Sequence, residues 1–88
     1  MEARLYELIR DYQKDRAHSV GGQVPEFRER VLRAFVSARA DRYPEYTLED
    51  GRLTRAIAQA RASGEIIAVG DIHRDPLLAL RQDHDAAS

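Results

Sequence analysis

The chain has 88 residues, of which 43% are hydrophobic and 33% are charged. A chain of this length forms one small domain, and this balance is typical of a folded protein and not of a disordered one. Without cysteine it can form neither a disulfide nor a thiolate metal site, and a formal net charge of −1 gives no global attraction to nucleic acid.

The sequence predicts a cytoplasmic protein. No apolar run approaches the roughly 18 residues that a membrane span requires, and no signal-peptide core follows Met1. A small fold without cysteine also suits a reducing compartment. We expect residues 1–82 to form a single helical domain and residues 83–88 to form a disordered polar tail.

Residues 2–17 are predicted to form the first helix. Its apolar side chains follow the i, i+3, i+4, i+7 spacing of one helical stripe: Leu5, Leu8, Ile9 and Tyr12. The segment 18–22, which contains Gly21 and Gly22, is expected to end it, because two glycines disfavour continued helix.

Residues 25–41 are predicted to form the second helix, with Pro25 at its first position, where the missing N–H group costs nothing. Two glutamate–arginine pairs have the favourable i,i+4 spacing: Glu26–Arg30 and Glu29–Arg33. The predicted buried face consists of Phe27, Val31, Ala34, Phe35 and Ala38, widened by Leu32 and Val36.

A connector at residues 42–47 contains Pro44, and Thr47 is a suitable N-cap for a third helix over residues 48–62. Gly51 is expected to divide this helix into a short turn and a main part. Its inward side chains are predicted to be Leu53, Ala56, Ile57 and Ala60.

Residues 65–69 are rich in β-branched side chains and predict a strand. Residues 70–76 indicate a loop, and residues 77–80 suit a return strand, with a short helix over 76–82 as the alternative. The predicted fold class is therefore mainly α with a C-terminal β-hairpin (α+β), three helices followed by a hairpin.

Residues 46–69, from Tyr46 to Val69, resemble the second half of a winged helix-turn-helix domain, as found in small regulators of phages and mobile elements. In that family a helix of this length ends in a glycine–acidic–apolar step and leads directly into the hairpin called the wing. The resemblance implies a DNA-binding regulator, acting as a homodimer on an operator, in which the third helix reads the major groove.

If the inward residues of that helix are buried, Thr54, Arg55, Ala58 and Gln59 face outward. Arginine can bond guanine and glutamine can bond adenine with two hydrogen bonds each, and alanine fits beside a thymine methyl group. The residues expected to contact phosphates are Arg52, Arg61 and, in the wing, Arg74. The competing interpretation is that these side chains only solvate a helix surface.

Two features depart from the family. The connector 42–47 is longer than the turn of about three or four residues in a helix-turn-helix, and the hairpin carries Asp71 and Asp75 where basic residues are usual. The alternative function is therefore a small protein-binding module, such as a phage-encoded inhibitor or adaptor. Its candidate anchors are Tyr43 and Tyr46, which suit either an interface or internal packing.

Enzyme chemistry and metal binding are not expected. Gly70-Asp71-Ile72-His73 resembles the first motif of calcineurin-like metallophosphoesterases, but Arg74 replaces the motif's final glycine and only fifteen residues follow His73. The remaining candidate ligands, Asp75 and residues 83–85, are too few for a closed site, so no metal and no cofactor are predicted.

Overall fold

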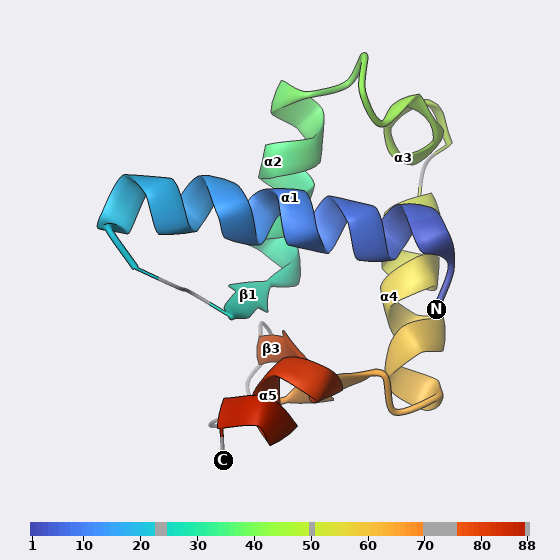
Figure 1. Cartoon of the computed structure of the whole chain (residues 1–88). Helices are drawn as coiled ribbons and strands as arrows, with labels where there is room; N and C mark the ends of the chain where they lie inside the picture. The colour runs from blue at the N-terminus through green and yellow to red at the C-terminus, as the bar shows by residue number, and fades with distance from the viewer. Residues whose placement is uncertain (23–24, 50, 70–75, 88) are drawn as a thin grey trace.

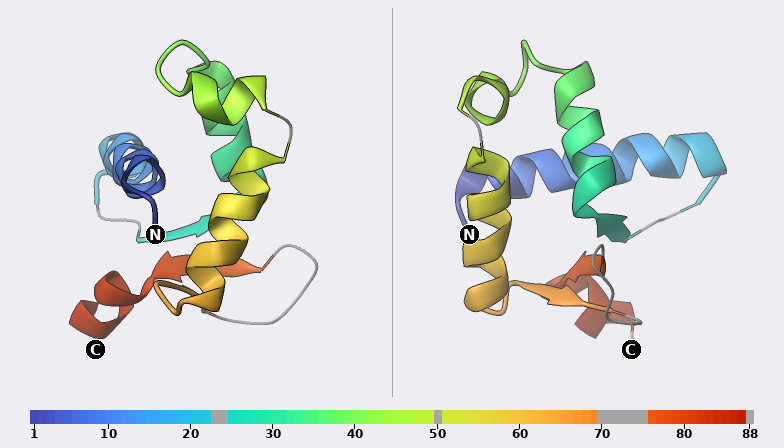
Figure 2. Two further views of the ribbon diagram at one scale, coloured as in Figure 1. Left: turned by 90° about the vertical axis from the view of Figure 1, so that its right-hand side faces the viewer. Right: turned by 180° about the vertical axis from the view of Figure 1, so that it is seen from behind.

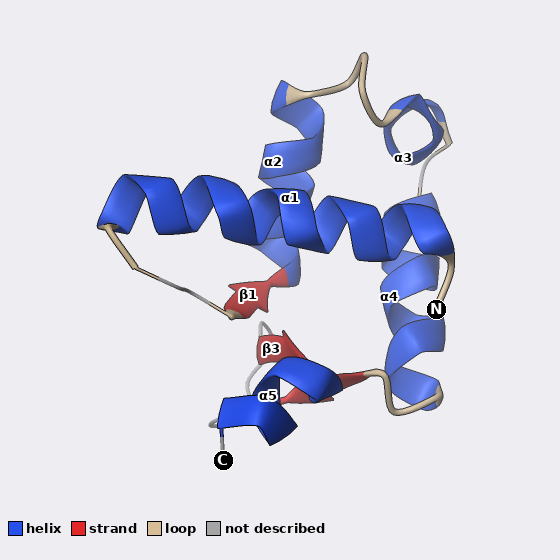
Figure 3. Ribbon diagram, in the orientation of Figure 1, coloured by secondary structure: helices blue, strands red, loops and turns tan. Residues whose placement is uncertain are grey.

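The computed structural model describes residues 1–22, 25–49, 51–69 and 76–87 (Figure 1). The structure is mainly helical with a small three-stranded antiparallel sheet, so the predicted α+β class is confirmed (Figure 3). The elements are α1 (Ala3–Val20), β1 (Glu26–Arg28), α2 (Glu29–Ala38), α3 (Pro44–Leu48), α4 (Arg52–Ala62), β2 (Ile66–Ala68), β3 (Leu77–Leu80) and α5 (Arg81–Ala87). Helix α1 packs against both α2 and α4.

Helix α1 buries the four predicted side chains and ends later than expected. It continues through Val20, and Gly21 ends it in a left-handed conformation with φ 75°. The Gly21 and Gly22 N–H groups both donate to the Ala17 carbonyl, at 2.9 and 3.1 Å. Glycine adopts this positive φ without a steric penalty, so the helix stops at the first residue that permits the cap.

The second helix is shorter than predicted, and its buried face is different. Residues 26–28, expected to be helical, form β1, in which Phe27 pairs with Leu78 of β3. Glu26 therefore cannot form its predicted helical pair with Arg30, whereas the Glu29–Arg33 pair exists at 2.9 Å.

Helix α2 turns Leu32, Phe35 and Val36 inward, while Val31, Ala34 and Ala38 are exposed. The inward residues and the exposed apolar residues both follow helical spacing, so periodicity alone could not decide which of the two sets faces the core. The observed orientation buries the larger side chains, which gives the greater hydrophobic stabilisation.

The predicted connector contains a helix. Pro44 occupies the first turn of α3, and Thr47, the predicted N-cap, lies inside that helix with its hydroxyl donating to the Pro44 carbonyl at 3.2 Å. The N-cap of α4 is Gly51, at φ 78°. Gly51 thus separates the two helices, as the sequence suggested, and the main helix begins at Arg52.

The hairpin prediction is confirmed, and a third strand joins it. Strands β2 and β3 pair antiparallel, with Ile67 opposite Ala79, and β1 adds to the other edge of β3 to give the order β1-β3-β2. The residues 70–75 between β2 and β3 lie outside the described part of the chain.

The predicted tail forms helix α5 up to Ala87 instead of a disordered segment. Asp83 attaches this helix to α1, because it accepts hydrogen bonds from Arg10 and from Gln13, each at 3.0 Å. Local sequence gives no sign of these contacts, which join residues far apart in the chain.

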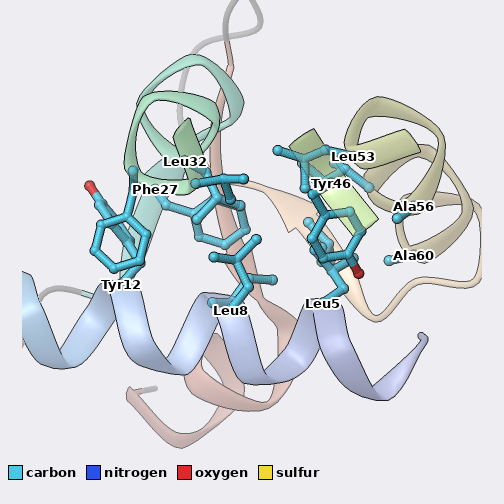
Figure 4. Close-up of a cluster of buried hydrophobic side chains, with 14 of the residues drawn as sticks. Leu5, Leu8, Tyr12, Phe27, Leu32, Tyr46, Leu53, Ala56 and Ala60 are labelled. Carbon is cyan, nitrogen blue, oxygen red and sulfur yellow. The ribbon is translucent and has the colours of Figure 1, made fainter. Parts of the chain in front are cut away.

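One core unites α1, α2, α3, α4 and the sheet. Figure 4 shows Leu5, Leu8 and Tyr12 on one side of α1, directed toward side chains of β1, α2, α3 and α4. The rings of Tyr12 and Phe35 meet edge to face at 5.4 Å between centroids. The core thereby fixes α4 against α1 and determines which side of α4 meets solvent.

Candidate nucleic-acid interface on helix α4

Helix α4 lies on the outside of the molecule and faces the viewer in the left panel of Figure 2. Its predicted inward residues Leu53, Ala56, Ile57 and Ala60 are all buried, none more than 5% exposed. The four side chains predicted to contact bases, Thr54, Arg55, Ala58 and Gln59, are all exposed. The predicted orientation of this helix is therefore correct.

Arg55 forms an ion pair with an acidic side chain on this surface. Its side chain is 60% exposed, and its Nη2 atom donates to Glu49 Oε1 at 2.5 Å. Glu49 lies just after α3 and is itself 54% exposed. The carboxylate therefore neutralises the arginine that the sequence assigns to guanine recognition.

Arg52, a predicted phosphate contact, has two carboxylate partners. Its guanidinium contacts Glu2 Oε2 at 3.4 Å and Glu49 Oε2 at 3.5 Å. Hydrogen bonding to Glu2 and the charge of Glu2 raise the pKa of Arg52 above its ordinary value. Arg52 thus joins the start of α4 to the N-terminal end of α1.

Thr54 of α4 accepts a hydrogen bond from Arg33, which is also in an ion pair with Glu29 within α2. Arg33 Nη2 donates to the Thr54 hydroxyl at 2.5 Å and to Glu29 Oε2 at 2.9 Å. The Glu29–Arg33 spacing was visible in the sequence, but its contact with Thr54 depends on the packing of the two helices. Arg33 is therefore a cation of this surface that sequence reasoning missed.

In the C-terminal half of the α4 surface, the polar side chains are not engaged with other described residues. Gln59 and Arg61 are exposed, and among the described residues their side chains make no hydrogen bond or ion pair. Ala58 lies between them and presents only a methyl group. Both polar side chains can therefore turn toward a ligand without breaking an internal contact.

A hollow of about 420 Å³ lies between α2, α3 and α4, next to this surface. Its lining includes the buried side chains of Val36, Tyr46 and Leu53 together with polar groups of Arg33 and Glu49. The α4 surface is thus recessed at the N-terminal end of the helix.

Tyr43 and Tyr46 are packing residues, so their proposed role as exposed anchors is wrong. They are 1% and 7% exposed, and their hydroxyls donate to Asp11 Oδ2 at 2.9 Å and Glu2 Oε2 at 2.8 Å. Burial, reinforced by the hydrogen bond to Asp11, raises the pKa of Tyr43 to about 12. Burial also raises the pKa of Tyr46, and both rings fasten the connector to α1.

The remaining predicted candidates fall mostly outside the described residues. Arg74, the wing phosphate contact, belongs to this group, as do Asp71, His73 and Asp75. Across the ranges that the structure describes, no cluster of histidine and acidic side chains is arranged to hold a metal ion.

Comparison with known proteins finds no family model that matches the chain, and no similar curated protein or solved structure. Within the described residues, no helix has both the length and the apolar character needed to cross a membrane.

Proposed function

We propose that this protein binds double-stranded DNA through the outward surface of α4, as a non-enzymatic regulator or accessory protein of winged-helix type. The observation that carries the proposal is the exposure of Arg55, Gln59 and Arg61 on a helix whose opposite side is buried. Arginine and glutamine are the side chains that bond guanine and adenine in the major groove.

The order of elements supports the same proposal. Helix α4 ends at Ala62 and is followed directly by the antiparallel pair β2 and β3, which is the arrangement expected of a wing. One feature departs from a simple helix-turn-helix, because α3 stands between α2 and α4 in place of a turn of about three or four residues.

Charge on the α4 surface is locally positive although the whole chain is not. The surface carries Arg33, Arg52, Arg55 and Arg61 against Glu2, Glu29 and Glu49. Affinity for DNA comes largely from neutralised phosphates, so a local excess of arginine is sufficient for modest binding.

Fluorescence anisotropy with a random-sequence duplex tests the proposal. Binding at about 50 mM salt that weakens steeply at about 200 mM is the expected result, because phosphate contacts release counterions. Absence of binding at the lower salt concentration would refute a DNA-binding function.

A second candidate function is a protein-binding module, such as an inhibitor or adaptor of a host protein machine. Exposed apolar side chains favour it: Leu48 at the end of α3 is 85% exposed and Val31 on α2 is 43% exposed. These residues replace the buried tyrosines as the candidate contacts for such a partner.

A further inference from the structure

Glu49 is placed to compete with DNA for Arg55. Its two carboxylate oxygens contact two different arginines of α4, Arg55 at 2.5 Å and Arg52 at 3.5 Å. A phosphate or guanine that approaches Arg55 meets a guanidinium that is already paired, and it meets the negative charge of Glu49 beside it. We propose that Glu49 is a selectivity residue that suppresses non-specific binding of DNA, an inference that rests on the proposed function.

Glu49 and DNA compete for the same guanidinium of Arg55. An exposed ion pair contributes little, so a strong bidentate contact with a base edge can displace Glu49. A single non-specific phosphate contact is of similar strength to the ion pair and gains little by displacing it. Glu49 therefore prevents the weak phosphate contacts of Arg55 and still permits its strong contacts with a base. This raises the ratio of specific to non-specific affinity for DNA.

Exposure makes this exchange possible. The side chains of Arg55 and Glu49 are 60% and 54% exposed, so the pair can open without disturbing the core. Gly51 lies between them in sequence, and a Cβ atom at that position would stand 4.0 Å from Arg55 Nη1. Gly51 adopts a left-handed conformation, with φ 78°, at the N-cap of α4.

The test compares Glu49→Gln with Glu7→Gln on random-sequence duplex DNA. Both variants remove one negative charge, and Glu7 is likewise an exposed partner of an arginine, Arg4 on α1, at 2.7 Å. Release of one additional phosphate contact should tighten binding by Glu49→Gln about three- to fivefold at low salt and steepen the log–log salt dependence by about 0.9. Glu7→Gln should bind as the unaltered protein does, apart from a small effect of net charge.

The double variant Glu49→Gln/Arg55→Ala shows whether the gain acts through Arg55. The gain should disappear when Arg55 is absent, relative to Arg55→Ala alone. Equal binding by Glu49→Gln and Glu7→Gln, with DNA binding by the unaltered protein intact, would overturn the role of Glu49 and leave the proposed function standing. Failure of all variants, the unaltered protein included, to bind DNA at low salt would overturn both.

Discussion

Arg55 and Gln59 are one helical turn apart on the exposed side of α4 and differ in their surroundings. Arg55 is paired with Glu49, whereas Gln59 has no side-chain partner among the described residues. A base contact by Arg55 therefore needs an exchange of partners, and one by Gln59 does not. At the scale of single residues, the sequence singled out these two exposed side chains and missed the carboxylate that pairs with one of them.

Substitution of Arg55 by alanine tests base recognition directly. On a duplex selected from random sequence, Arg55→Ala is expected to weaken binding by about 1–3 kcal/mol and to relax specificity at one base pair. Lys14→Ala removes an exposed cation of α1 and serves as the matched control. Binding measured across single-base variants of the target decides the matter, and a uniform loss at every position would mean that Arg55 contacts only phosphate.

The raised pKa of Tyr43 predicts that the protein loses stability at alkaline pH. Burial and the hydrogen bond to Asp11 raise its pKa from 10.0 to about 12, so the unfolded chain releases this proton first. The corresponding stabilisation is complete below pH 10 and is lost as pH rises toward 12. Urea unfolding at a series of pH values should show this decline, and Tyr43→Phe should make it shallower. An unchanged pH dependence in Tyr43→Phe would contradict the assignment.

At the scale of elements, α2 shows why hydrophobic periodicity was insufficient. The apolar residues of α2 occupy most of its circumference. Their spacing was therefore compatible with either Val31 or Leu32 facing the core. Pairing of Phe27 with Leu78 converts residues 26–28 into β1 and fixes where the helix can start. The orientation of helix α4 was predicted correctly because its large apolar residues, Leu53 and Ile57, lie on one side, opposite Arg55 and Gln59.

Alanine substitutions at two adjacent positions of α2 test which side of this helix faces the core. Leu32 is 0% exposed and Val31 is 43% exposed. Leu32→Ala should lower the free energy of unfolding by about 2–5 kcal/mol, because it leaves a cavity in the core. Val31→Ala should change it by no more than about 0.5 kcal/mol, as expected of a surface site. Similar costs for the two variants in urea unfolding would refute the observed rotation of the helix.

At the scale of the whole molecule, the distribution of charge matters more than its sum. The formal net charge is −1, and the excess of arginine is local to α4 and its neighbours on α2. If all four arginines of that surface contact phosphates, the log–log salt dependence in the anisotropy titration should be no steeper than about −4. A much steeper dependence would place the DNA-binding surface elsewhere on the molecule.

The arrangement of the elements also explains how α4 is presented. Helix α1 packs against it, and the hydroxyls of the buried Tyr43 and Tyr46 bond the connector that precedes it to Asp11 and Glu2. The two hydrogen bonds join residues that lie 32 and 44 positions apart in the chain. The surface is therefore held by the whole core and not by α4 alone.

The sequence by itself determined the helical character of α1 and α4, the hairpin of β2 and β3, and the side of α4 that meets solvent. Each of these depends on local periodicity, on β-branched residues or on a glycine, and such signals act over a few residues. Only the tertiary structure decided the strand β1, the rotation of α2, the burial of Tyr43 and Tyr46, and the pairing of Glu49 with Arg55. These features depend on contacts between elements, whose free energies local sequence does not encode.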